Sequence, residues 1–139
     1  MTTGGRLAWL SLTPDELRLL RAAAAQGLAI EAEASGAKGR LLEVLSARLE
    51  KQGRSPFPAV RLTAPEVEAL GPAFRALLDG LRRLRRSDPG ALSPASQGVL
   101  AEYLPDAADA PAKAALEEQK VKALQVKVGL QKRWVKGMA

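Results

Sequence analysis

The chain has 139 residues, 47% of them hydrophobic, and a formal net charge of +6 at pH 7. This length predicts one compact domain or two very small ones, and the apolar share argues against wholesale disorder. Because the sequence contains no cysteine and no histidine, it excludes disulfides, the usual zinc sites and every mechanism that needs an imidazole or a thiolate.

Much of the hydrophobic share is alanine, and few residues are aromatic. We therefore expect a thin core built from leucine-lined helix faces, and self-association that adds to its stability. The first residues lack the layout of a signal peptide, and no apolar run approaches the roughly 18 residues of a membrane span. These features predict a cytoplasmic protein without a membrane span.

The first helix is expected to begin after Thr13, because Thr13-Pro14-Asp15-Glu16 offers a capping residue, a proline at the first helical position and a capping-box glutamate. Leu17, Leu20 and Ala24 follow at helical spacing, and Gly27 is a plausible stop.

Residues 28–37 fit either a short extended piece or a helix. The next helix, at about 37–51, carries its leucines on one side: Leu41, Leu42, Leu45 and Leu49. A glycine and two prolines at 53–58 then predict a linker at 54–60.

A second unit opens at Leu62-Thr63-Ala-Pro65-Glu66, which echoes the start of the first helix. We interpret this echo as helix-start chemistry and not as an internal repeat. Gly71-Pro72 is expected to interrupt the helix, which resumes and continues to about Arg86. Ser93-Pro94 predicts a further helix that ends near Leu104.

The last segment, at about 111–136, begins with a strongly helical composition, with acids near its start and bases near its end. Its apolar residues at 124–130 alternate, which also fits a strand, but no partner strand is evident elsewhere in the sequence. The predicted fold is therefore all-α: a helix-pair module at 1–53, a linker at 54–60 and a helical unit at 61–139 that ends in a long basic helix.

The second helix of the pair opens with Gly36-x-Lys38-x-x-Leu41, and Leu45 follows one turn later. This pattern resembles the SAP family and its LEM-like and Rho amino-terminal relatives, which are helix–extended–helix modules. The resemblance implies that Gly36 makes the turn and that Lys38 and the start of the second helix face DNA phosphate. Arg40 lies close to Lys38 in the sequence and is added as a candidate phosphate contact. An ordinary helical hairpin also explains the pattern.

Two further stretches concentrate positive charge. Residues 82–86 place four arginines in five residues at the end of a helix: Arg82, Arg83, Arg85 and Arg86. Arginine suits phosphate, although cations are also favourable at a helix carboxyl terminus for structural reasons.

The last twenty residues hold six bases and no acid, which equals the net charge of the whole chain. The candidate nucleic-acid-binding residues of this segment are Lys120, Lys122, Lys127, Lys132, Arg133, Trp134 and Lys136. We expect this stretch to be left without neutralising carboxylates because something negative docks there. Trp134 fits base stacking, and equally an anchor in the core or in an oligomer.

The lysine-rich segment from Ala114 to Arg133, preceded by an amino-terminal helix pair, gives the chain a layout similar to that of phage small terminase subunits. This similarity implies DNA recognition through the amino-terminal part and assembly through the later helices.

No glycine-rich phosphate loop is present, and the acid pairs at 15/16, 66/68 and 117/118 are interpreted as helix-start chemistry, so no enzymatic activity, metal, cofactor or small-molecule substrate is expected. The favoured function is sequence-nonspecific nucleic-acid binding, with DNA favoured over RNA. The alternative is a helical assembly or adaptor protein, such as a phage packaging subunit, whose basic tail binds an acidic partner or packs in an oligomer. A polyanion strand as ligand predicts that the cations at 38–40, 82–86 and 120–136 converge on one surface, and scattered cations would favour the alternative.

Overall fold

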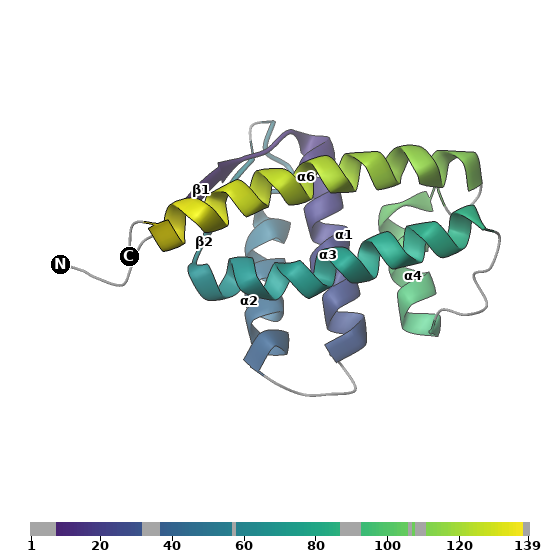
Figure 1. The fold of residues 1–139 in the computed structure, drawn as a ribbon, viewed down its shortest axis with the longest axis horizontal. Helices are drawn as coiled ribbons and strands as arrows, with labels where there is room; N and C mark the ends of the chain where they lie inside the picture. The colour runs from purple at the N-terminus through teal and green to yellow at the C-terminus, as the bar shows by residue number, and fades with distance from the viewer. Residues whose placement is uncertain are drawn as a thin grey trace.

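The computed structural model describes residues 8–31, 37–56, 58–86, 93–105, 107 and 111–137. In chain order the elements are β1 (Ala8–Ser11), α1 (Pro14–Glu31), α2 (Ala37–Lys51), β2 (Ala59–Leu62), α3 (Ala64–Arg85), α4 (Pro94–Tyr103) and α6 (Pro111–Gly137), as Figure 1 shows. The fold is predominantly α-helical, which confirms the predicted class. None of the described helices is long and apolar enough to cross a bilayer.

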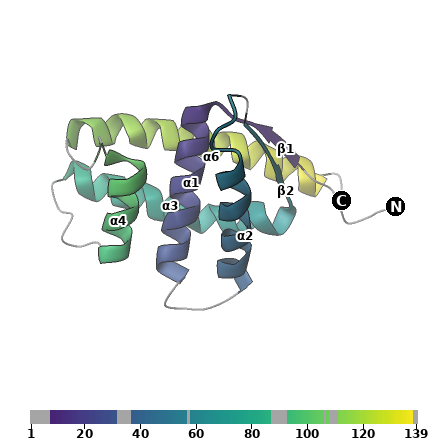
Figure 2. The same cartoon turned by 180° about the vertical axis from the view of Figure 1, so that it is seen from behind.

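The helices form two layers. The long helices α3 and α6 run antiparallel in one layer, and α1, α2 and α4 cross behind them, as the front and back views show (Figures 1 and 2). Helix α1 packs against α2, α3 and α4, and α6 lies along α3 and also reaches β1. The predicted helix pair, α1 and α2, therefore packs directly against helices of the later unit.

Both strand-to-helix junctions have the same local structure. Thr13 N–H donates to Glu16 Oε1 at 2.9 Å and Glu16 N–H donates to Thr13 Oγ1 at 3.1 Å, which is the predicted capping box. Thr63 and Glu66 repeat this exchange at the start of α3, at 2.9 and 3.4 Å. The two capping boxes confirm the helix-start chemistry of both sequences, and the structure adds a strand in front of each cap.

The sequence did not predict the two strands. Strand β1 pairs with β2 in antiparallel register, with Leu10 opposite Val60 and Ala8 opposite Leu62. Each strand has only four residues, too few for a clear alternation, and it forms its ladder only with a partner about fifty residues away in the sequence. The predicted linker at 54–60 therefore ends inside β2, whereas residues 124–130 lie in α6 and confirm the helical prediction.

The predicted helix stop at Gly27 is wrong, because α1 continues to Glu31. Gly27 is buried, and a Cβ atom there would lie 2.7 Å from Leu42 Cδ1 and 2.9 Å from Ala73 Cβ. The glycine serves close approach of α1 to α2 and α3, and not helix termination.

The predicted interruption at Gly71-Pro72 is also wrong, because α3 runs through both residues. Proline removes one intrahelical hydrogen bond. The neighbouring Leu70 and Phe74 are each at most 1% exposed, so tertiary packing holds the helix across the missing bond.

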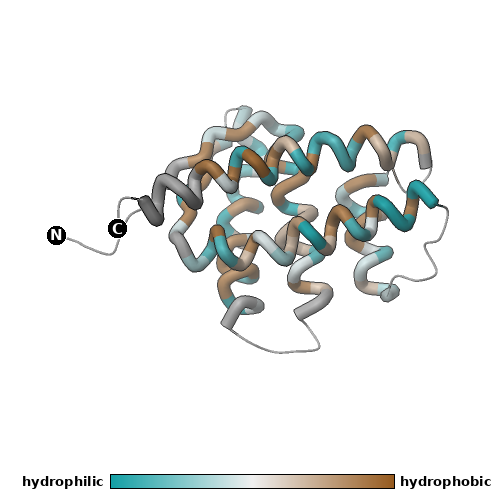
Figure 3. The backbone as a smooth tube through the Cα atoms, viewed as in Figure 1, coloured by the Kyte–Doolittle hydropathy of each residue, from teal (hydrophilic) through white to brown (hydrophobic). Residues whose placement is uncertain are grey.

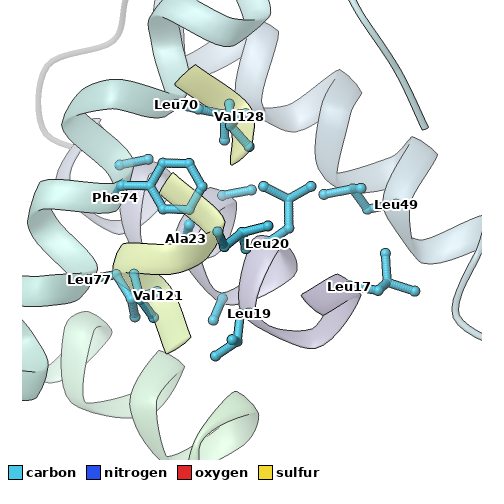
Figure 4. Packing of buried hydrophobic residues seen from close by; sticks show 14 of the residues in the cluster. Leu17, Leu19, Leu20, Ala23, Leu49, Leu70, Phe74, Leu77, Val121 and Val128 are labelled. Carbon is cyan, nitrogen blue, oxygen red and sulfur yellow. The ribbon is translucent and has the colours of Figure 1, made fainter. Parts of the chain in front are cut away.

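The core is rich in leucine and alanine, as the composition predicts. Hydrophobic and hydrophilic positions alternate along α3 and α6, as expected for helices that bury a face (Figure 3). Figure 4 shows Phe74 from α3 packed among Leu20 and Ala23 of α1 and Val128 of α6, and all of these belong to one hydrophobic cluster of the described residues.

Candidate nucleic-acid interface

The described side chains cover most, but not all, of the predicted basic residues. The side chains of Lys38, Lys132, Arg133, Trp134 and Lys136 lie outside them. The candidate residues with described side chains are therefore Arg40 on α2, the arginines at the end of α3, and three lysines of α6.

The end of α3 and the second turn of α6 meet at Glu118. Arg82 Nε donates to Glu118 Oε1 at 2.9 Å, Arg85 Nη1 lies 3.4 Å from Oε2, and Lys122 Nζ lies 3.8 Å from Oε1. We call these four residues the Glu118 cluster. The antiparallel packing of α3 against α6 thus joins two stretches that the sequence singled out separately.

The Glu118 cluster carries excess positive charge, since three cations share one carboxylate. The Glu118 side chain is 5% exposed, whereas those of Arg82, Arg85 and Lys122 are 44%, 45% and 55% exposed. Burial raises the pKa of the Glu118 carboxyl, but the hydrogen bond from Arg82 and the charges of Arg85 and Lys122 outweigh it, and the pKa falls below its usual value. The carboxylate therefore stays ionised inside a cationic surface.

The three cations are not held equally. Arg82 donates a hydrogen bond, whereas Glu118 Oε2, the atom nearest Arg85, is buried without a hydrogen-bond partner. Arg85 and Lys122 are therefore held by charge at longer distance, and their exposed ends can turn towards a ligand at little cost.

Two more arginines lie beside the cluster. Arg83 Nε donates to Asp79 Oδ2 at 3.0 Å, one turn earlier on α3. Arg86 caps the helix through its backbone N–H, which donates to the Arg82 carbonyl, and the residue is exposed.

A second group of charges ties α6 to the start of α1. Arg18 pairs with Asp15 at 2.6 Å and with Glu117 at 2.8 Å, and Lys120 lies 3.4 Å from both carboxylates. Lys127 Nζ pairs with Glu16 at 3.0 Å and donates to the Ser11 carbonyl. We call these six charged residues the α1–α6 network.

The α1–α6 network is balanced, with three cations and three carboxylates. Burial raises the pKa of Asp15 and of Glu16, but hydrogen bonds and the nearby cations outweigh it, so both pKa values are lowered. The expectation that the basic stretch lacks neutralising carboxylates is therefore wrong for Lys120 and Lys127, which stabilise the fold. Lys122 also has a carboxylate partner, but shares it with two arginines.

The interpretation of the acid pairs as helix-start chemistry is confirmed for Glu16 and Glu66, which cap α1 and α3. It is wrong for Glu117 and Glu118, which lie beyond the first turn of α6 and are 7% and 4% exposed. Helical spacing marks Lys120 and Lys122 as local partners of Glu117 and Glu118. Arg18 and Arg82 reach the two glutamates only in the folded chain, and no local pattern predicts those pairs.

The predicted basic regions do not form one surface in the described part of the molecule. The α3 and α6 regions meet at Glu118, but α2 begins at the end of the α1–α2 hairpin that points away from α6 (Figures 1 and 2). Arg40 is exposed there.

No family model, curated protein or solved structure matches this chain.

Proposed function

We propose that the protein binds nucleic acid through phosphate contacts without sequence preference, using the Glu118 cluster together with Arg83 and Arg86. The observation that carries the proposal is that three exposed cations share the single carboxylate of Glu118.

The hydrogen bond from Arg82 already places one cation directly against the buried carboxylate. Arg85 and Lys122 add positive charge that Glu118 cannot neutralise. Like charges gathered around one carboxylate repel one another, and the repulsion is stronger near a protein surface than in bulk water. A phosphate beside Arg85 and Lys122 would relieve this repulsion.

The chemistry of the cluster suits phosphates in particular. A guanidinium donates two parallel hydrogen bonds to a phosphate, and Arg85 presents its guanidinium at an exposed helix end. Contacts of this kind carry no base information, so affinity for duplex and single-stranded DNA should depend mainly on phosphate density and salt.

The proposal is tested by the fluorescence anisotropy of labelled DNA and RNA oligonucleotides titrated with protein at several salt concentrations. The double variant Arg85→Gln/Lys122→Gln should bind duplex DNA more weakly and lower the slope of log affinity against log salt by about 2, since each phosphate contact contributes about 0.9.

The matched control is Lys51→Gln/Arg54→Gln, which removes one lysine and one arginine from exposed positions at the end of α2. It should bind DNA nearly as the wild type does. Equal losses in both double variants would show that only net charge matters, and no binding by the wild-type protein at low salt would remove the proposal.

A further inference from the structure

Helix α6 has two apolar faces. One face is buried against the rest of the fold through Ala114, Val121, Leu124 and Val128, each at most 3% exposed. The opposite face carries Leu116, Val126 and Leu130, which are 54%, 65% and 57% exposed. A helix at the edge of a bundle needs only one apolar face, so the second face has no role in the described fold.

The exposed residues follow a coiled-coil spacing. Leu116, Ala123 and Leu130 are seven residues apart, which places them at one heptad position a, and Gln119 and Val126 occupy position d. At 1.5 Å per residue, the stripe from Leu116 to Leu130 is about 21 Å long. Val121 and Val128 fall at position f, on the opposite side of the helix, where they are buried.

Lysines flank this stripe on both sides. Lys120 and Lys127 occupy position e, and Lys122 occupies position g. Charges at e and g decide which partner helix a coiled coil accepts. Lys120 and Lys127 are paired with carboxylates of the α1–α6 network but keep 39% and 37% of their side chains exposed. Lys122 is 55% exposed and shares Glu118 with two arginines, so a second helix laid on the stripe would meet excess positive charge at Lys122.

The same charges argue against a second copy of α6 as the occupant. The acids of α6, Glu117 and Glu118, are buried on the inward side, and the sequence holds no acid after them. Pairing two copies would set lysines against lysines in either direction.

We infer that the outward face of α6 is a docking surface for an amphipathic helix of another protein, with an aliphatic stripe of heptad spacing and glutamate or aspartate on both flanks. The occupant lies along Leu116, Ala123, Val126 and Leu130. Its acids face Lys122 on one flank and the exposed ends of the paired Lys120 and Lys127 on the other. The docking surface is separate from the Glu118 cluster except for Lys122, which faces both.

The test uses the full chain and two synthetic three-heptad peptides with leucine at a and d. One peptide carries glutamate at e and g and the other carries lysine there. In a fluorescence anisotropy titration the glutamate peptide should bind with a Kd on the order of 10 µM, and the lysine peptide should not bind up to roughly 1 mM. Failure of the glutamate peptide to bind overturns the inference, as does equal binding by the two peptides.

A matched pair of variants locates the binding. Val126→Gln should weaken binding of the glutamate peptide by roughly five- to tenfold, because glutamine keeps the helix but cannot bury the same apolar surface. Val44→Gln changes another exposed valine, 56% exposed on α2, and should leave peptide binding unchanged. Equal losses in the two variants would contradict docking on α6.

Two further measurements test whether a second copy of the chain or a membrane surface occupies the outward face of α6 instead. If sedimentation shows a dimer of the wild-type chain that Val126→Gln dissociates, a second copy covers the face. If vesicles of anionic phospholipid bind the wild type and not Val126→Gln, while the glutamate peptide fails to bind, the face meets a membrane surface. Val126→Gln keeps every charge, so DNA binding by this variant should equal that of the wild type whichever result is found.

Discussion

Glu118 has opposing effects on the fold and on the proposed binding surface. Its carboxylate is buried and holds α3 to α6 through Arg82, while the two additional cations leave the surface around it positive. A carboxylate that stabilises the fold therefore also lowers the affinity of the same surface for a polyanion.

We predict that Glu118→Gln lowers stability and raises DNA affinity at low salt. Glutamine retains an oxygen that accepts the Arg82 hydrogen bond, but three cations then lack their anion, and the free energy of unfolding should fall by about 2 kcal/mol. Urea denaturation and the oligonucleotide titration measure the two effects.

Glu102→Gln serves as the control for Glu118→Gln, because it removes a carboxylate from an exposed position on α4. Its stability should change by less than about 0.5 kcal/mol. A Glu118 variant that loses stability and also loses DNA affinity would contradict the role proposed for the cluster.

At the scale of the elements, the glycines of α1 and α6 have different roles although both lie inside helices. Gly27 is buried where α1 approaches α2 and α3, and a Cβ atom there would contact Leu42 and Ala73 at under 3 Å. Gly129 in α6 is exposed, and nothing lies within 4 Å of the position of its Cβ atom.

Gly27→Ala and Gly129→Ala should therefore change stability in opposite directions. Overpacking at position 27 is expected to lower the free energy of unfolding by about 1–3 kcal/mol, which exceeds the stabilisation from alanine's higher helix propensity. At position 129 only the higher helix propensity of alanine acts, so the free energy of unfolding should rise by about 0.5–1 kcal/mol. Thermal and urea unfolding measure both changes, and stabilisation by Gly27→Ala would show that the helices can separate without cost.

At the scale of the whole molecule, the described core joins the predicted helix pair to the rest of the chain. Leu20 of α1 and Leu45 of α2 belong to the same cluster as Leu77 of α3 and Val121 of α6, and the α1–α6 network adds a polar tie. Separating residues 1–53 would expose the faces of α1 and α2 that α3 covers.

We predict that a peptide of residues 1–53 does not fold cooperatively. A unit this small is marginal even with an intact core, and here part of its core is supplied by α3. Circular dichroism on heating should show a broad, non-cooperative loss of helix, in contrast to the full chain. A sharp transition in the peptide would instead support an independent helix-pair module, as the SAP-like resemblance implies.

The limits of most helices could be predicted from the sequence because they depend on local chemistry. Thr13, Thr63 and Ser93 each accept a hydrogen bond from the first turn of the helix that follows. The leucine spacing of α2 likewise predicts its range of 37–51. The capping residues and the leucine spacing each lie within, or a few residues from, the helix that they predict.

The strands and the partners of the charges were decided by tertiary structure. Strands β1 and β2 are four residues long and exist because they pair across some fifty residues of chain. The sequence determined that residues 120–139 are basic and predicted a helix at about 111–136, but the antiparallel packing of α6 decided which of its lysines also face carboxylates of α1. Charge is a property of the residue, whereas its neutralisation depends on distances that only the folded chain sets.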